Sequence, residues 1–265
     1  MLRPKKSLGQ NFLIDQNIIK KIIKTVNISN KNIVEIGPGT GNLTKEILKQ
    51  SPNKLFLIEK DKQLHNKLEE EFKFNKIIKL FNADVLEFDI EKLLKKKDTI
   101  IFGNLPYNIS TQILVKLIKF KVWPPSYQKL VLMFQKEVAE KILASFNTPE
   151  YGRLTVITKR NLKVLNKFNI SKNCFYPKPK VDSTLLVFQP IINNKVNIKD
   201  INNLEKITRI MFSNKRKMIN KSFMKLFNDY IKVSKDLKIN LNSRPSELEE
   251  NIYYKITEYF EKINN

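Results

Sequence analysis

Residues 32–49, NIVEIGPGTGNLTKEILK, carry the pattern that decides the fold. The first five residues are mostly apolar and predict a buried strand, whereas the last eight have the composition of a helix. Between them lies the turn GPGTG, which contains three of the six glycines in the chain. A strand, a glycine-rich turn and a helix in this order are typical of the first unit of a doubly wound α/β sheet.

The same alternation continues along the chain. Apolar runs predict further strands at residues 54–59, 76–84, 98–104 and 128–135, and a charged segment over 62–72 predicts a helix between the first two. These runs are continuous rather than alternating in polarity, as in parallel strands that helices cover on both faces. Two later runs, at 162–170 and 183–189, are predicted to be antiparallel. We therefore expect an α/β fold with a mostly parallel, seven-stranded sheet and an antiparallel last strand.

The apolar rhythm stops in residues 190–200, PIINNKVNIKD, which we interpret as a linker. Beyond this segment, apolar side chains recur at helical spacing, as in Leu204, Ile207 and Met211. We predict an α/β domain over residues 1–189 and a small all-helical domain over residues 190–265.

The composition limits the classes of function. The 265 residues have a formal net charge of +23, which suits a polyanionic partner such as nucleic acid. A compositional bias towards lysine on solvated faces is the alternative explanation of this charge. One cysteine and one histidine leave no disulfide framework and no His- or Cys-rich metal site. No apolar run is long enough to span a bilayer and no signal peptide is recognisable, so we expect a cytoplasmic protein without membrane contact.

The glycine turn and two carboxylates predict a cofactor site. A turn of this kind lets a ligand approach the backbone amides at a helix N-terminus, although its G-x-G-x-G spacing differs from the dinucleotide fingerprint. Glu59 ends the second predicted strand and can accept hydrogen bonds from ribose hydroxyls. Asp84 ends the third and can hold the amino group of an adenine. Each feature taken alone also fits a structural turn, a cap or a surface residue, but all lie at the carboxyl edge of the sheet.

A second cluster, Asn-Leu-Pro-Tyr, follows the fourth predicted strand in TIIFGNLPYNIS (residues 99–110). Methylation of an exocyclic amine requires acceptors for the amine hydrogens, and the Asn104 side-chain oxygen and the Leu105 carbonyl can supply them. Pro106 brings no N–H donor and stiffens the turn. Tyr107 offers a ring on which a base can stack, a contact worth ~1–3 kcal/mol. Positioning alone can support this reaction without a general base.

These motifs resemble those of the ribosomal RNA adenine dimethyltransferases. The resemblance rests on SLGQNFL (7–13), VEIGPGTGNLT (34–44), FGNLPYNIST (102–111), EYGRLTV (150–156) and CFYPKPKVDS (174–183). Two C-terminal segments, MFSNKRKMINKSF (211–223) and RPSELEEN (244–251), are similar to the small-subunit, KsgA-type branch of that family. The family has a Rossmann-like class I methyltransferase sheet, which agrees with the strand pattern.

The resemblance also implies site residues. It implies S-adenosylmethionine contacts at Asn11, Leu13, Gly37, Gly39, Glu59, Asp84 and Asn104, and target-base contacts at Asn104, Leu105, Pro106, Tyr107 and Phe175. For Phe175 ordinary core packing is the alternative, and the adjacent Tyr176 leaves open which ring faces the base. Candidate phosphate contacts, for which a merely solvated basic surface is the alternative, are Lys5, Lys6, Lys215, Arg216, Lys217 and Lys221.

The implied reaction is dimethylation of N6 in two adjacent adenosines of a hairpin loop near the 3′ end of small-subunit ribosomal RNA. The implied methyl donor is S-adenosylmethionine, and the expected partner is that RNA within an assembling small subunit, with the protein as a monomer. Two alternatives stay open at this point. One is a methylase of large-subunit RNA of the macrolide-resistance type, and the other is a nucleic-acid-binding factor that uses the same fold without catalysis.

Overall fold

A computed structural model describes residues 4–5, 8–94 and 98–264. The chain forms two compact units: residues 1–139 with 163–190 (unit 1), and residues 140–162 with 191–265 (unit 2). The predicted boundary near residue 190 coincides with one junction, whereas residues 140–162 belong to unit 2 and not to the α/β part. The division into an α/β domain over residues 1–189 and a helical domain over residues 190–265 stays a prediction.

Unit 1 is built on a seven-stranded sheet in the order β4-β3-β2-β5-β6-β9-β7. The strands are β2 (Asn32–Ile36), β3 (Lys54–Glu59), β4 (Ile78–Asn82), β5 (Thr99–Asn104), β6 (Tyr127–Gln135), β7 (Leu162–Ile170) and β9 (Ser183–Pro190). The pairs from β4 through β6 are parallel, and β9 pairs antiparallel with β6. The predicted sheet, with its antiparallel last strand in chain order, is confirmed.

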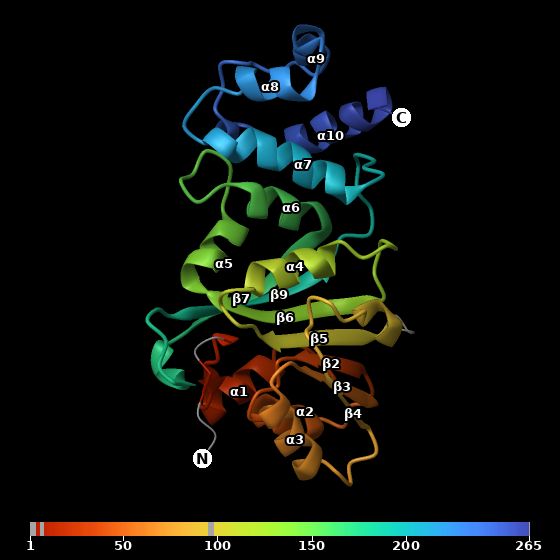
Figure 1. Ribbon diagram of the computed structural model, residues 1–265, viewed down its shortest axis with the longest axis vertical. Coiled ribbons are helices and arrows are strands. Elements are labelled where there is room, and N and C mark those ends of the chain that lie inside the picture. Colours follow the sequence, from red (N-terminus) through yellow and green to blue (C-terminus); the bar gives the residue numbers. More distant parts are fainter. Residues whose placement is uncertain (1–3, 6–7, 95–97, 265) are drawn as a thin grey trace. The chain divides into compact units, whose positions relative to one another are not determined.

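Helices connect the parallel strands, and Figure 1 shows them packed around the sheet of unit 1. Between successive parallel strands lie α2 (Asn42–Leu48), α3 (Lys62–Glu71), a 3-10 turn (Ile90–Leu93) and α4 (Ser110–Ile118). Helix α1 (Gln16–Ile23) precedes β2, and α5 (Lys136–Leu143) follows β6 and crosses the junction between the units. The Asp15 carboxylate caps α1 by accepting the N–H groups of Asn17 and Ile18. Asp61 caps α3 in the same way through the N–H of Gln63. Each cap satisfies a backbone donor that the helix itself cannot pair.

The core of unit 1 explains the continuous apolar runs of the sequence. All five residues of β2 are buried, because the strand lies in the middle of the sheet and is covered on both faces. Side chains of α1 and α2 close one part of this core, with Ile19, Ile22 and Ile47 at 0–1% exposure. Burial of each such side chain contributes roughly 1.5–3 kcal/mol.

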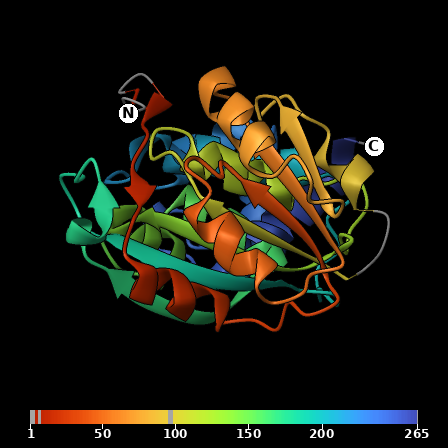
Figure 2. The ribbon, with the colours of Figure 1, turned by 90° about the horizontal axis from the view of Figure 1, so that it is seen from below.

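A second, two-stranded sheet joins the N-terminal segment to a distant loop. It pairs β1 (Phe12–Leu13) antiparallel with β8 (Phe175–Tyr176), directly after a 3-10 turn (Lys172–Cys174). Figure 2 shows the red N-terminal segment beside the teal segment around β8. The pairing places residues that are far apart in sequence side by side.

Unit 2 is helical, as the sequence predicted for its C-terminal part. It contains α6 (Arg153–Asn161), α7 (Ile201–Met211), α8 (Asn220–Leu226), α9 (Tyr230–Asp236) and α10 (Glu250–Asn264), with 3-10 turns at Phe212–Asn214 and Pro245–Glu247. Its core includes the rings of Tyr151, Phe212 and Tyr253, of which the last two are stacked at 5.3 Å. None of the helices in the described ranges is long and apolar enough to cross a bilayer.

Candidate active site

The carboxyl ends of three adjacent parallel strands meet at one edge of the sheet in unit 1. Ile36 at the end of β2 is in register with Ile58 of β3 and with Gly103 of β5. The residues that follow these positions, Gly37, Glu59 and Asn104, therefore come together and line one cavity. Such an edge is where open α/β sheets bind their ligands.

The glycine turn shapes one wall of this cavity. Gly37, Gly39 and Gly41 all have positive φ angles, between 59° and 79°, which residues with a side chain rarely adopt. At Gly39 an added Cβ would also lie only 2.9 Å from Cδ1 of Phe12, whereas at Gly37 the nearest atom would be 3.9 Å away. Only glycine therefore lets this turn fold closely against the N-terminal segment.

Glu59 lies at the end of β3 with its carboxylate held by backbone N–H groups. Oε2 accepts from Gly39 at 3.0 Å and Oε1 from Asp61 at 2.8 Å. The side chain is buried, and this burial raises the pKa of Glu59, although hydrogen bonds from backbone N–H groups oppose the rise. The two bonds use about half of the acceptor capacity of a carboxylate.

Asp84 lies beyond the end of β4 and is paired with a lysine. Oδ2 accepts from Nζ of Lys60 at 2.6 Å, and Oδ1 accepts from the N–H of Leu86 at 2.9 Å. The hydrogen bond from Lys60 lowers the pKa of Asp84 and keeps the carboxylate ionised. The ammonium of Lys116 in α4 donates to the carbonyls of Leu86 and Phe88, which holds the loop that carries Asp84.

Asn104 is oriented by a residue 93 positions away. Its Nδ2 donates to the backbone carbonyl of Asn11 at 2.8 Å. Because a carbonyl oxygen can only accept, the amide must present its nitrogen to Asn11 and its oxygen to the other side. Within the part of the chain that the structure describes, no donor pairs with this Oδ1. Asn104 therefore has a free acceptor at the cavity.

Tyr107 is held at both its backbone and its ring. Its hydroxyl lies 2.7 Å from Oγ of Ser183 in β9, and its backbone carbonyl accepts from Ser110. Burial raises the pKa of Tyr107, so the phenol stays protonated at neutral pH. The hydroxyl contact anchors the far end of a ring that lines the cavity.

Most residues that the sequence singled out for the cofactor and the base line the same cavity. These are Asn11, Leu13, Gly37, Gly39, Glu59, Asp84, Asn104, Leu105, Pro106 and Tyr107. Phe175 is not among the lining residues: it is 3% exposed and packs in the core of unit 1 beside Leu13. Tyr176 is 57% exposed. The core position of Phe175 favours the packing interpretation over base contact, and its role in catalysis stays a prediction.

The basic candidates fall into separate groups. Lys5 lies in unit 1 and forms an ion pair with Asp61 at 2.9 Å. Lys6 lies outside the described residues. The four others lie in unit 2, where Lys215 donates to the carbonyl of Pro149 and the remaining three are Arg216, Lys217 and Lys221. Their contacts with RNA stay predictions.

Sequence reasoning missed Glu35 in β2, which lines the same cavity. Its carboxyl is 2% exposed and accepts a hydrogen bond from Thr44 at 2.7 Å. Burial raises the pKa of Glu35 to about 8, the Thr44 bond opposes this rise, and the nearby Glu59 adds to it. A carboxyl inside an otherwise apolar strand was the signal that could have found it.

Comparisons with known proteins show the family to which the chain belongs. The sequence pattern of the family described as Ribosomal RNA adenine dimethylase matches residues 1–262. Ribosomal RNA small subunit methyltransferase A of Pelagibacter ubique (strain HTCC1062) is 45% identical over 265 residues, covering 99% of this chain and 98% of the relative. The chain belongs to the ribosomal RNA adenine dimethylase family. A second relative of the same name, from Malacoplasma penetrans (strain HF-2), is 38% identical and covers 95% of this chain and 90% of its own length.

Solved structures place this dimethylase among proteins of the same fold. A dimethyladenosine transferase from Plasmodium falciparum superposes with a TM-score of 0.76 at 26% identity, over 96% of this chain and 98% of that one. The 23S rRNA methyltransferase ErmE superposes with a TM-score of 0.66 at 21% identity, over 96% and 100% of the two chains, which shows the shared fold. The family match and the named full-length relatives, together with this fold, show that the chain is an enzyme of the methyltransferase class.

Proposed function

We propose that this dimethylase transfers methyl groups from S-adenosylmethionine to N6 of two adjacent adenosines near the 3′ end of small-subunit ribosomal RNA, two to each adenosine. The single observation that carries the proposal is the orientation of Asn104, whose amide oxygen is free at the cavity while its nitrogen is held by Asn11. The names of the relatives, which refer to the small ribosomal subunit, support this choice of RNA.

The cavity has the donor and acceptor groups that S-adenosylmethionine needs. Glu59 keeps acceptor capacity for the two hydroxyls of a ribose, because its two bonds to backbone N–H groups leave further lone pairs. Asp84 can accept from the amino group of the adenine in the same manner. The positive φ of Gly37 lets the backbone of the turn face the cavity without a side chain. When bound, S-adenosylmethionine supplies a methyl group that its positively charged sulfonium activates for transfer.

The Asn-Leu-Pro-Tyr segment would receive the target adenine. Asn104 Oδ1 and the Leu105 carbonyl accept the amine hydrogens, so that the nitrogen lone pair points away from them and towards the methyl group. Pro106 adds no competing N–H donor. Each transfer forms one N–CH₃ bond, breaks one S–CH₃ bond and releases the amine proton to water. No general base is needed, because orientation and the leaving group lower the barrier.

Aromatic and basic groups would hold the RNA. The Tyr107 ring, fixed by its bond to Ser183, stacks on the flipped base, and unstacking a base costs only a few kcal/mol in a loop. We propose that Phe175 or the exposed Tyr176 packs on the opposite face of the base. Phosphate contacts are proposed for the basic candidates of both units: Lys5, Lys6, Lys215, Arg216, Lys217 and Lys221.

The proposed substrate suggests where the protein acts and what it binds. We propose that the protein acts as a monomer in the cytoplasm and that it meets its RNA within an assembling small ribosomal subunit. The small-subunit interpretation is preferred to a large-subunit methylase because both relatives carry the small-subunit name. The intact Asn-Leu-Pro-Tyr segment and the cofactor carboxylates argue against a factor without catalysis.

The test is methyl transfer from labelled S-adenosylmethionine to undermethylated small-subunit particles, with large-subunit RNA offered in parallel and nucleoside analysis of the digested RNA. Dimethyladenosine at two adjacent positions near the 3′ end is the expected result. Label on large-subunit RNA alone would move the protein to the resistance branch. Tight RNA binding with no label on either substrate would support the factor without catalysis.

A variant links the reaction to Asn104. Asn104→Ala should abolish methyl transfer while the fold and most of the RNA affinity persist. Asn66→Ala serves as the matched control, because this asparagine is exposed on α3 and does not line the cavity. Turnover of Asn104→Ala at the wild-type rate would remove Asn104 from the mechanism.

A further inference from the structure

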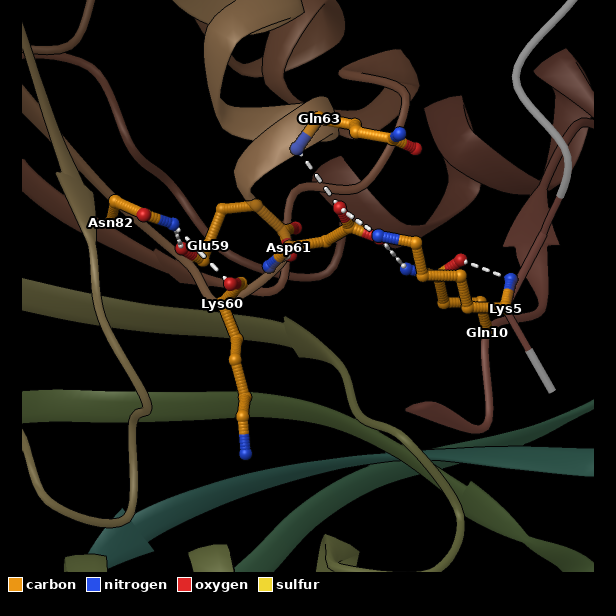
Figure 3. A network of polar contacts seen from close by, with 7 residues as sticks. All are labelled: Lys5, Gln10, Glu59, Lys60, Asp61, Gln63 and Asn82. Atoms are coloured by element: carbon orange, nitrogen blue, oxygen red, sulfur yellow. Dashed lines mark hydrogen bonds and ion pairs between the residues drawn. The ribbon is translucent and has the colours of Figure 1, made fainter. Parts of the chain in front are cut away.

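The N-terminal segment over residues 8–13 lines the active-site cavity. One acidic side chain, which does not itself line the cavity, holds this segment in place. Asp61 accepts hydrogen bonds from Nζ of Lys5 at 2.9 Å and from Nε2 of Gln10 at 3.0 Å. The backbone N–H of Lys5 in turn donates to Oε1 of Gln10 at 2.7 Å. Figure 3 shows these three residues, which we call the clasp, in contact with one another.

Asp61 also contacts the part of the site that would hold the cofactor. The residue is 4% exposed, and its backbone N–H donates to the Glu59 carboxylate at 2.8 Å. Burial raises the pKa of Asp61, but the bonds from Lys5, Gln10 and Gln63 together hold it below the usual value. The carboxylate is therefore ionised and fully engaged at neutral pH, and one residue joins the N-terminal segment, Glu59 and the start of α3.

The other end of the segment reaches the catalytic side of the site. The carbonyl of Asn11 accepts from Nδ2 of Asn104, and the carbonyl of Leu13 accepts from Nδ2 of Asn42 at the start of α2. A shift of the segment would remove the acceptor that makes the Asn104 amide point its oxygen away from Asn11. The amide could then rotate and present N–H donors to an amine that needs acceptors.

We propose that Asp61, through Gln10 and Lys5, is a positioning residue for methyl transfer: the clasp holds residues 8–13 so that Asn11 orients the amide of Asn104. This inference rests on the proposed function. The clasp also couples the two halves of the site, because the same residue supports Glu59 on the cofactor side. Loss of the clasp therefore lowers kcat and weakens S-adenosylmethionine binding together.

An exchange of donor and acceptor within the clasp tests this role. Gln10→Glu keeps the acceptor for the Lys5 N–H but places two carboxylates against each other. Asp61→Asn keeps the cap of α3 and the Lys5 contact but places two amide nitrogens against each other. In the double variant the new amide at position 61 donates to the new carboxylate at position 10, so every hydrogen bond of the clasp is restored. Lys5 then donates to an amide oxygen in place of a carboxylate, and the net charge is that of the wild type.

Each single variant should lower kcat by about tenfold to a hundredfold, as small misplacements of reacting groups do. The double variant should recover kcat and the cofactor Kd to within about threefold of the wild type, as coupled neighbours do when their contact is rebuilt. Gln63→Ala is the matched control, because its side chain points away from Asp61 in Figure 3 while its backbone N–H remains. This control should keep both parameters.

The values of kcat and cofactor Kd, together with methyl transfer by the wild type, distinguish the possible outcomes. Wild-type kcat and Kd in both single variants would overturn the proposal, as would a double variant no better than the singles. If Gln10→Glu fails to fold, Gln10→Ala removes the contact without adding charge, and its unchanged kcat would equally refute the clasp. Absence of methyl transfer by the wild type would instead refute the proposed function, and the cofactor Kd, measured without RNA, would still decide on the clasp.

Discussion

Glu35→Gln should remove a pH dependence of stability that the wild type carries. The Glu35 carboxyl lies in β2, 2% exposed, and burial raises its pKa from 4.5 to about 8. In the unfolded chain the same carboxyl ionises near the lower value. Between the two values the native state holds a proton that the unfolded state has lost, so the free energy of unfolding falls as pH rises. The contribution of Glu35 is fully present below pH 4.5 and is lost through pH 8.

The magnitude follows from the same two pKa values. Each pKa unit corresponds to ~1.4 kcal/mol, and between pH 6 and pH 8 the wild type should lose about 2 kcal/mol of unfolding free energy through this group. The amide that the substitution introduces is neutral at every pH and can still accept the hydrogen bond from Thr44. The stability of the variant relative to the wild type should therefore rise by about 2 kcal/mol over this interval.

Urea denaturation at pH 6 and pH 8 measures this difference. Trp123 is the one tryptophan of the chain and lies in unit 1, so its fluorescence reports the unit that contains Glu35. Glu69→Gln, a change at an exposed carboxylate on α3, is the control and should keep the wild-type pH dependence. If the wild type and Glu35→Gln show parallel pH dependences, the inference that Glu35 is protonated in the native state is refuted.

Further substitutions at three positions test the geometry of the Asn-Leu-Pro-Tyr segment. In Gly103→Ala the new Cβ would lie 2.5 Å from Cδ2 of the buried Leu105. Thermal unfolding should show that the free energy of unfolding falls by about 1–3 kcal/mol, and the methyl-transfer rate should fall as well. Unchanged values would mean that the segment shifts to admit the added methyl group at no cost. Asn104→Asp places an oxygen against the Asn11 carbonyl, so kcat should fall by about a hundredfold or more in the transfer assay. Tyr107→Phe keeps the stacking ring and loses one hydrogen bond worth ~0.5–1.5 kcal/mol, so its rate should exceed that of Tyr107→Ala. Equal rates for the two tyrosine variants would contradict stacking.

Local patterns in the sequence were sufficient to predict the sheet and the position of the site. Continuous apolar runs predicted parallel strands because only strands covered on both faces lack polar alternation. Once the strands were parallel, Gly37, Glu59 and Asn104 had to share one edge, since each lies at or just beyond the end of its own strand. The cavity that these residues line confirms that placement.

The state of the site residues depends on contacts that no local pattern contains. Asn104 is oriented by a carbonyl 93 residues away, and Lys5 is paired with a carboxylate 56 residues away. Phe175 and Tyr176 are adjacent in sequence, yet pairing of β8 with β1 buries the first ring and exposes the second. In a strand, neighbouring side chains point to opposite faces, and the sequence alone does not say which face is covered.

The sequence by itself therefore determined the order of strands and helices, the edge at which the site lies and the residue types that line it. The tertiary structure decided which way the Asn104 amide faces, that Glu35 is buried with a pKa of about 8, and that Asp61 holds the N-terminal segment. The physical reason is one of range. Strand and helix formation follows from neighbouring residues, whereas orientation, burial and ionisation depend on groups that only the folded chain brings together.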